Sequence, residues 1–379
     1  MEIHWYLVPQ EGRLPFLQHS RNAGGRSVPN YDFFRQLAGA IDYNGYSGAL
    51  LATGGGGHDA WTVASSLIPL TERMKFIIAQ HPGLTAPLLL AQQAATFDHF
   101  SKGRLIINVV NGTNPQGPPY GRFEDHDDRY ALADEYWGVW RRIMQGETVT
   151  FDGRFVKVRD ARLSIEPFQK PYPELYFGGS SPAAMAVAAK HVDTYLTWGE
   201  PPLQAAEKIA AVRAFAKAQG RTLRYGLRIN VIVRDTEEEA WAVAQWMYDR
   251  IDKTAIDFHR RQLSATDSVG QLRQAGIIGN REISKNARDL ELLPNLWAGL
   301  SLAIGGPLAF TIVGDAQTVA ERIREYERIG FDVFILSSFP LIDESHRVAE
   351  YLFPLLKPSG SRYAEEALAD QPYRAVAAG

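Results

Sequence analysis

Short apolar runs alternate with amphipathic segments along most of this chain. The runs that predict strands lie at 3–8, 48–52, 75–80, 104–110, 175–177, 192–196, 224–233 and 333–336. Helical periodicity between them predicts helices at 31–43, 59–68, 87–100, 128–144, 182–190, 202–219 and 316–329. Because eight strands in strand–helix alternation fit a closed barrel better than an open doubly wound sheet, we expect an α/β fold, a (β/α)8 TIM barrel with insertions.

Two segments interrupt this alternation. The segment 147–158 holds Asp-Gly between alternating apolar residues, which is the signature of a β-hairpin. The segment 237–306 begins with a charged helix at 237–251 and continues as a long polar stretch. We expect residues 1–357 to form a single barrel domain, with an insertion near 252–306 that serves as an active-site lid. Residues 358–379 then form a C-terminal tail that is mobile or used in oligomer contacts.

Composition excludes several classes of function. Of the 379 residues 45% are hydrophobic and 22% charged, with a formal net charge of −3, as in a globular protein without a nucleic-acid or anionic-membrane partner. The absence of cysteine excludes disulfides, thiolate metal sites and cysteine nucleophiles, and it fits the reducing cytoplasm, where we expect the protein. The N-terminal stretch MEIHWYLVPQ is not a signal peptide, and no apolar run reaches the roughly 20 residues that span a bilayer.

The stretch ELYFGGSSPAAMAVAAKHVDTYLTWGE, residues 174–200, is a strand–turn–helix–strand unit. Gly178 and Gly179 let the backbone approach a ligand closely, and Ser180 and Ser181 supply hydroxyl groups at a helix N-terminus. The turn suits a phosphate, but the same residues also make an ordinary helix cap.

Polar residues follow the predicted strands, where a barrel of this kind places its active site. The set is polar, aromatic and glycine-rich, and it includes Gln10, Thr53, Gly57, His81, Asn111, Trp198, Arg228, Asn230 and Ser338. The set holds no pair of carboxylates for glycoside hydrolysis, no histidine cluster for a metal, and no nucleophile elbow or Walker loop. A pocket without a nucleophile suggests that a cofactor carries the chemistry, and flavin mononucleotide (FMN) suits the Gly-Ser turn.

Several of these residues have structural alternatives. An inward-facing Arg228 is costly in a barrel unless an anion pairs with it, so we favour a ligand over a structural ion pair. His81 and Trp198 are either ligand contacts or loop and rim residues. In the stretch EDHDDRY, Asp127 is a candidate helix cap and Arg129 a candidate partner in an internal salt bridge.

Eight stretches together resemble the bacterial luciferase-like superfamily, and within it the FMN-dependent alkanesulfonate monooxygenases. They are TGGGGHDAW (53–61), QAATFDHFSKGRLIINVVNG (93–112), DHDDRY (125–130), QKPYPELYFGGSS (169–181), VDTYLTWGEPP (192–202), GLRINVIVRDTEEEAW (226–241), LLPNLWAGL (292–300) and VGDAQTVAERIREYERIGFDVFILSSFP (313–340). The resemblance implies a dimer or tetramer that receives reduced FMN (FMNH2) from a separate NAD(P)H-dependent flavin reductase. With O2, such enzymes cleave a carbon–sulfur bond and release sulfite and an aldehyde.

Carried over by position, the resemblance implies roles for individual residues. The flavin would be held by Asn111, His126, Tyr130, Gly179, Ser180 and Ser181, with the two serines at its phosphate. Arg228 would bind the sulfonate or steady the oxygenated flavin. We expect the substrate to meet Gln10, Thr53, Gly57, Trp198, Arg228 and Ser338. Asn230 and His346 join Arg228 as candidate catalytic residues, with His81 as a further candidate base, and we expect no metal site.

The chain also departs from the family pattern. Gly55 and Gly57 replace the arginine and cysteine that relatives carry in this loop, and Asn230 replaces their histidine. Phe339 and Ile304 replace a tyrosine and a loop arginine. The added volume and neutral hydrogen-bonding groups favour a larger, hydroxylated sulfonate such as the sugar sulfonate sulfoquinovose. A flavin monooxygenase for another sulfur or nitrogen compound, and a non-catalytic flavin- or deazaflavin-binding protein, remain the alternatives.

Overall fold

The computed structural model describes residues 1–7, 30–53, 57–112, 120–251, 266–279, 285–303 and 310–364. Within them, eight parallel strands form a closed barrel. These strands are β1 (Glu2–Leu7), β2 (Gly48–Leu51), β3 (Lys75–Gln80), β4 (Leu105–Val109), β7 (Glu174–Gly178), β8 (Thr194–Trp198), β9 (Arg224–Arg234) and β13 (Val333–Ser337). Each pairs with the next, and β13 returns to pair with β1. The predicted barrel is confirmed, and its eight strands are the eight that the hydrophobic pattern predicts.

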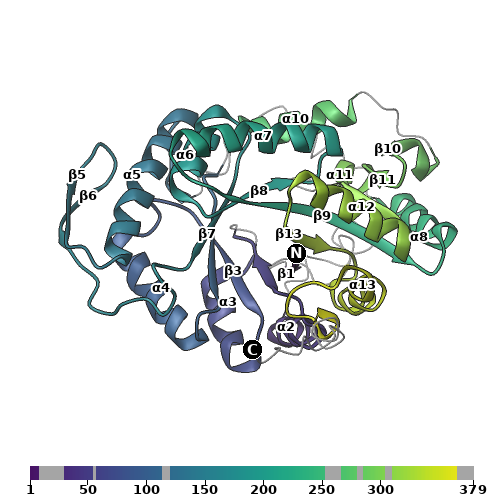
Figure 1. Cartoon of the computed structure of the whole chain (residues 1–379), viewed down its shortest axis with the longest axis horizontal. Coiled ribbons are helices and arrows are strands. Elements are labelled where there is room, and N and C mark those ends of the chain that lie inside the picture. The colour runs from purple at the N-terminus through teal and green to yellow at the C-terminus, as the bar shows by residue number, and fades with distance from the viewer. Residues whose placement is uncertain are drawn as a thin grey trace, which may run out of the picture.

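Helices cover the outside of the barrel (Figure 1). They are α2 (Tyr31–Asn44), α3 (Ala60–Leu67), continued by a short 3-10 helix η1 (Ile68–Leu70), α4 (Pro87–Ser101), α5 (His126–Met144), α6 (Pro182–His191), α7 (Pro202–Ala218), α12 (Ala316–Ile329) and α13 (Leu341–Leu356). The sequence explains their ends: the Asn30 side chain accepts from the Phe33 N–H to begin α2, and Gly45 ends it at a φ of 78°. The sequence pattern did not predict α13. No described helix is long and apolar enough to cross a membrane.

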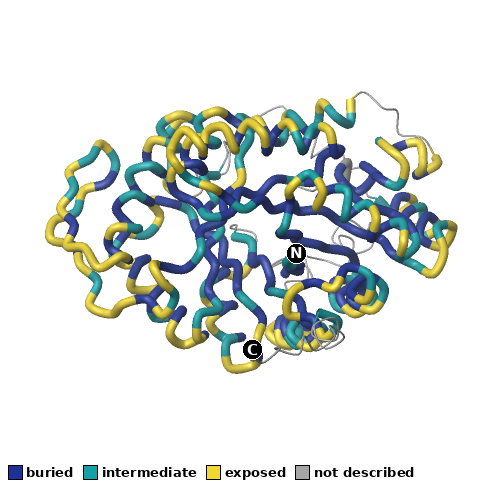
Figure 2. Tube along the Cα trace, in the orientation of Figure 1, coloured by how far each residue is buried: buried dark blue, intermediate teal, exposed yellow. Residues whose placement is uncertain are grey.

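The core lies in two layers. The larger cluster fills the space between the strands and the surrounding helices, so that the strands are buried and the outer helix faces exposed (Figure 2). A smaller cluster lies inside the barrel and consists of Leu50, Ile77, Ile106, Tyr176, Leu196, Val333 and Ile335. Since Leu50, Leu196 and Ile335 also line the cavity described below, this inner layer forms an apolar floor beneath it.

The predicted hairpin is confirmed and extends away from the barrel (Figure 1). Its strands β5 (Val149–Asp152) and β6 (Lys157–Ala161) pair antiparallel. The Glu135 carboxylate of α5 accepts hydrogen bonds from the backbone N–H groups of Arg154, Phe155 and Val156. One side chain of the barrel thereby holds the whole hairpin turn.

A second departure from the simple barrel follows β9. The last five residues of β9 pair with a further parallel strand, β12 (Thr311–Asp315), which the sequence pattern did not predict. Between these strands lie the predicted charged helix α8 (Glu237–Asp249), α10 (Val269–Ile278), the 3-10 helix η3 (Ala287–Leu290), β10 (Glu291–Leu293), β11 (Leu296–Trp297) and α11 (Gly299–Ala303). Strands β10 and β11 pair antiparallel and continue onto β12, so the end of this segment joins the barrel sheet.

Candidate active site

A cavity of about 340 Å³ opens where the barrel strands end. Its described lining comes from β1, β2, β3, β4, β7, β8, β9 and β13, from α5, and from residues 267–271 around the start of α10. A volume in this range is typical of small-molecule and cofactor sites. Nine residues expected from the sequence line it: Thr53, Asn111, His126, Tyr130, Gly179, Ser180, Ser181, Trp198 and Arg228.

The two glycines of the turn after β7 are required by close packing. A Cβ atom on Gly178 would lie 2.6 Å from the Leu196 carbonyl oxygen, and one on Gly179 would lie 2.5 Å from the Ala184 Cβ atom. The Tyr195 hydroxyl of β8 donates a hydrogen bond of 2.6 Å to the Gly179 carbonyl oxygen. The turn is therefore pressed against the neighbouring strand and leaves its cavity face free of side chains.

The two serines of this turn have different structural roles. The Ser181 hydroxyl accepts a hydrogen bond of 3.2 Å from the Ala184 N–H, and its residue is only 3% exposed, so Ser181 is the N-cap of α6. Ser180 lies next to it, partly exposed to the cavity, and its hydroxyl meets no hydrogen-bond partner among the described residues. One serine of the turn therefore caps the helix, and the adjacent serine leaves its hydroxyl group exposed to the cavity.

Asn111 places a polar group at the cavity without a protein partner. Its amide nitrogen and oxygen are both buried, and neither meets a hydrogen-bond partner in the part of the chain that the structure describes. A buried amide normally forms hydrogen bonds, since leaving it without one costs about 1–3 kcal/mol. The arrangement fits a ligand that supplies both a donor and an acceptor.

The start of α5 contributes an aromatic and charged edge. The rings of His126 and Tyr130 lie 4.9 Å apart, and His126 Nδ1 lies 2.7 Å from the Asp127 carboxylate. Burial raises the pKa of Tyr130, so this phenol stays protonated and able to donate. The predicted cap at Asp127 is wrong, because the Asp125 carboxylate accepts from the Asp128 N–H instead.

Arg228 faces the cavity from β9, as its alternation along the strand predicts. The residue is 8% exposed, and its guanidinium carbon lies 4.0 Å from the centre of the Tyr6 ring. This cation–π contact orients the planar guanidinium within the cavity. Tyr6 is at the end of β1, a position that the alternation of that strand could have identified as inward-facing.

Other expected residues do not line the cavity. The Asn230 amide oxygen accepts a hydrogen bond of 2.5 Å from the Ser337 hydroxyl of the adjacent strand. His346 lies on α13, where its Nδ1 atom is 2.9 Å from the Asn44 amide nitrogen of α2. Asn230 lies within β9 and His346 within α13, and neighbouring elements take up the polar groups of both residues.

The remaining expected residues do not line the cavity in the part of the chain that the structure describes. The Ser338 hydroxyl donates to the Glu344 carboxylate, 3.2 Å away, and is not part of the cavity lining. Gly57 is also absent from that lining, and Gln10 falls outside the described residues. His81 packs beside Tyr120, and burial, with the charge of Arg122, lowers its pKa to about 4.

Sequence reasoning missed the polar residues that reach the cavity from α5 and from the insertion. Arg129 pairs with Asp267 rather than within its own helix. Gly270, also lining the cavity, packs so closely on Trp198 that a Cβ atom would lie 2.9 Å from the indole. The segment before α10 has no periodicity, so no signal pointed to Asp267. Among the described residues, no group of three or more His, Asp or Glu side chains could hold a metal ion.

Comparison with known proteins identifies the family. The family model described as luciferase-like monooxygenase matches residues 13–333. This chain belongs to the luciferase-like monooxygenase family. The expected superfamily is confirmed, and the family model does not distinguish the alkanesulfonate branch within it.

Solved structures share the same barrel at low sequence identity. Riboflavin lyase (RcaE), with modified FMN and its substrate riboflavin, is 20% identical with a TM-score of 0.75, covering 98% of this chain and 96% of that chain. EDTA monooxygenase (EmoA) from Chelativorans sp. BNC1 is 18% identical with a TM-score of 0.74, covering 94% and 93%. Long-chain alkane monooxygenase (LadA) is 19% identical with a TM-score of 0.72, covering 98% and 96%. Identities this low support the fold alone.

Proposed function

We propose that this protein is a two-component monooxygenase that uses reduced FMN and O2 to desulfonate an organosulfonate. A separate NAD(P)H-dependent reductase supplies the flavin. The observation that carries the proposal is that the Gly-Ser turn after β7 and the Arg228 guanidinium line one cavity. Family membership supports the monooxygenase chemistry, and the FMN in the riboflavin lyase structure supports the choice of flavin.

The residues present fit a flavin. The buried Asn111 amide has both a donor and an acceptor to offer, as the edge of a flavin ring requires. The turn at Gly178 and Gly179 is a cradle that side chains would fill, and the Ser180 hydroxyl opens onto it. His126 and Tyr130 supply a further hydrogen-bonding edge. When bound, reduced FMN supplies two electrons and activates O2.

Arg228 is the group that we assign to the substrate. Its guanidinium donates two parallel N–H groups, which match two oxygens of a sulfonate. The reaction converts R–CH2–SO3⁻, O2 and FMNH2 to R–CHO, HSO3⁻, FMN and water. Negative charge gathers on the sulfite as the carbon–sulfur bond breaks, and a fixed cation beside it stabilises that charge. Stacking on Tyr6 keeps the guanidinium from turning away.

The cavity wall favours a hydroxylated substrate over a purely alkyl one. Thr53, Ser268 and Gln271 bring hydroxyl and amide groups to it, next to the Trp198 indole. Such neutral groups bind sugar hydroxyls, and an aromatic ring packs on a sugar face. We therefore propose a sugar sulfonate such as sulfoquinovose as the substrate, with an alkanesulfonate as the simpler variant of the same class.

The insertion takes part as a cover for the site. Residues 267–271 line the cavity together with the barrel strands, and the Arg129–Asp267 pair joins the insertion to α5. A cover of this kind excludes water, so that reducing equivalents reach the substrate rather than being lost as peroxide. We propose that the segment 252–306 is the active-site lid.

The test is sulfite release. The protein is mixed with a flavin reductase, FMN, NADH and air, with sulfoquinovose, alkanesulfonates, a sulfone and a polyaminocarboxylate offered in turn. We expect sulfite from the sulfonates, most rapidly from sulfoquinovose, and loss of at least about 100-fold in kcat/KM for Arg228→Ala. Arg250→Ala, at an exposed arginine over Trp246, is the control. Flavin turnover on the sulfone or polyaminocarboxylate without sulfite from any sulfonate would assign a different substrate class, and no O2-dependent turnover at all would favour a binding protein.

A further inference from the structure

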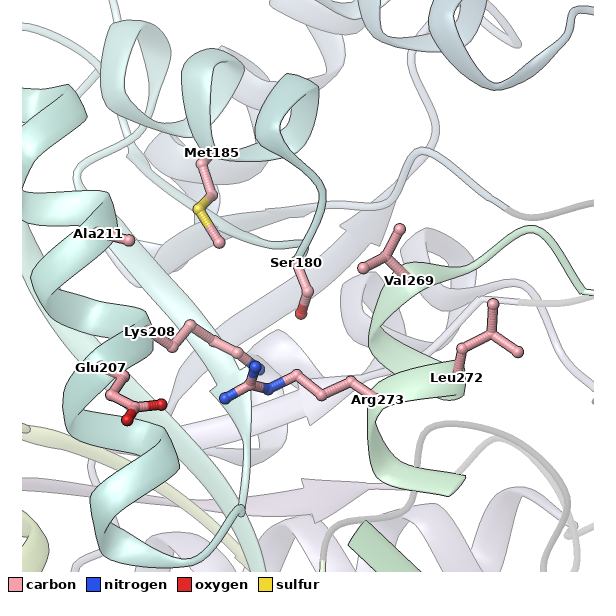
Figure 3. A pocket seen from close by; sticks show the side chains of 8 residues that line it. All are labelled: Ser180, Met185, Glu207, Lys208, Ala211, Val269, Leu272 and Arg273. Carbon is pink, nitrogen blue, oxygen red and sulfur yellow. The ribbon is translucent and has the colours of Figure 1, made fainter. Parts of the chain in front are cut away.

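A second space of about 410 Å³ adjoins the cavity at Ser180, between α6, α7 and α10 (Figure 3). Its two cations, Lys208 and Arg273, both bind the buried carboxylate of Glu200, and Glu207 adds another negative charge. The rest of its wall is apolar and consists of Met185, Ala211, Val269 and Leu272. The charges on this side of the cavity are therefore balanced within the protein, and they do not point to a ligand.

Asn111, after the neighbouring strand β4, is different, because its buried amide meets no partner among the described residues. The Val110 N–H, just before it, donates a hydrogen bond of 2.9 Å to the Gln80 carbonyl oxygen at the end of β3. Gly112, just after it, has a φ of 76°, in the left-handed region. The chain therefore leaves the sheet at Asn111, and the direction of this side chain depends on how its two neighbours are held.

The His81 ring lies against both of these neighbours. It donates a hydrogen bond to the backbone carbonyl of Val110. A Cβ atom on Gly112 would lie 3.7 Å from both the Cε1 and the Nδ1 atom of His81, so the ring packs directly on this glycine. The Tyr120 ring also packs on the imidazole, with 5.9 Å between the two ring centres. His81 thus supports the backbone on both sides of Asn111 without lining the cavity itself.

The backbone that carries this ring is itself held by side chains. The Gln80 side-chain nitrogen donates a hydrogen bond of 2.8 Å to the His81 carbonyl oxygen, and the Gln80 side-chain oxygen accepts one of 2.8 Å from the Trp61 indole. Burial, with the charge of Arg122, lowers the pKa of His81 to about 4. At neutral pH the ring is therefore uncharged and has a single N–H group, which the Val110 carbonyl oxygen accepts.

We propose that His81 is a positioning residue, which holds the backbone around Asn111 so that the Asn111 amide faces the flavin. The inference rests on the proposed function, in which this amide binds the edge of the flavin ring. Because the amide has no hydrogen bond to a described residue, other side chains do not fix its direction, and the backbone on either side must do so. His81 is the side chain that contacts this backbone at both Val110 and Gly112.

The experiment is a double-mutant cycle in which FMN dissociation constants are measured by flavin fluorescence for His81→Phe, Asn111→Ala and the double variant. Phenylalanine keeps a ring against Gly112 but removes the hydrogen bond to Val110. We expect each single variant to bind FMN about 3- to 10-fold more weakly, and the double variant no more weakly than Asn111→Ala alone. The absorption maxima of bound FMN should shift in the same direction in all three. The control is His99→Phe, whose Nε2 atom lies 2.7 Å from the Glu166 carbonyl oxygen, outside the cavity lining.

Two results would overturn the inference. Losses of affinity that multiply in the double variant would mean that His81 and Asn111 act independently. Lower thermal stability in His81→Phe, with the affinity and the spectrum of bound FMN unchanged, would make His81 a purely structural residue. If His81→Phe does not fold, as judged by circular dichroism, His81→Leu replaces it in the cycle. A wild type that shows the coupling between His81 and Asn111 but releases no sulfite would contradict the proposed function and leave this inference standing.

Discussion

The Arg129 guanidinium donates to the Asp267 carboxylate over 2.5 Å, although 138 residues separate them in the chain. Arg129 is 8% exposed on its side chain and also donates to the Glu124 carbonyl oxygen, so α5 holds it firmly in place. Asp267 is next to Ser268, the N-cap residue of α10. Together with the Arg273–Glu200 pair, this contact fixes the described part of the insertion against the barrel at two points.

Replacing Asp267 by asparagine tests whether this contact closes the site. The change leaves Arg129 buried without its anion, which costs about 1–3 kcal/mol and favours separation of the insertion from the barrel. We expect more hydrogen peroxide per NADH consumed and less sulfite. The measurement is the ratio of peroxide to sulfite in the coupled reductase assay. The control is Asp152→Asn, which breaks the exposed ion pair with Lys157 in the hairpin. An unchanged ratio of peroxide to sulfite in Asp267→Asn would mean that the Arg129–Asp267 contact does not help to close the site.

Gly179→Ala tests the steric requirement of the turn. The new methyl group would lie 2.5 Å from the Ala184 Cβ atom, so the turn or α6 must shift. We expect at least a roughly tenfold loss of FMN affinity, because misplacement at a rigid site is costly. Gly39→Ala in α2, where a Cβ atom meets nothing within 4 Å, should instead stabilise the fold by about 0.5–1 kcal/mol. Titration with FMN and urea unfolding separate the two outcomes.

Tyr195→Phe removes the hydrogen bond that holds the turn against β8. The Gly179 carbonyl oxygen loses its donor at 2.6 Å, and we expect the free energy of unfolding to fall by about 1 kcal/mol. Flavin binding should weaken as well, since the bond supports the cradle rather than the core. Tyr43→Phe, at a residue 76% exposed, gives the baseline in the same urea titration. Equal stability of the two variants would mean that the bond contributes nothing.

His81 makes stability depend on pH. Burial and Arg122 lower its pKa from 6.5 to about 4, so the unfolded chain binds more protons than the folded one between these values. Stability therefore rises from pH 4 to 6.5 and is lost as the pH falls through that window, by roughly 3 kcal/mol for this group. The free energy of unfolding of His81→Gln should show a shallower slope over this range. An unchanged slope in His81→Gln would mean that this histidine does not carry the pH dependence.

The local sequence pattern was sufficient to predict the barrel strands but not all of the elements attached to the barrel. Each barrel strand is a continuous apolar run with a helix after it, and both properties can be read within a short window. The strand β12 is a five-residue run whose partner is the end of β9, about eighty residues earlier. Its pairing is non-local and leaves no periodic signal. The helix α13 contains Pro354, which disguises a helical pattern that packing on α2 and α12 nonetheless stabilises.

The cavity residues likewise fall into those that the local sequence predicts and those that it does not. The turn around Gly179 and the alternation that points Arg228 inward are local features, and both could be predicted. The same alternation places Asn230 on the face of β9 that carries Arg228, but it does not show that the Ser337 hydroxyl, on a strand distant in sequence, takes up the Asn230 amide oxygen. Asp267 depends on its partner across the cavity, and nothing in its own neighbourhood marks it.

The pairing of β9 with β12 has a consequence for how this family can vary. Thr311 lies opposite Asn230 and Asp315 opposite Arg234, so the chain leaves the barrel and returns to it at adjacent points of one sheet. The segment between β9 and β12 is therefore held to one sheet at both of its ends. It can be exchanged or lengthened without reopening the barrel, which makes a chimera with the corresponding segment of another family member a practical route to new substrates on an unchanged frame.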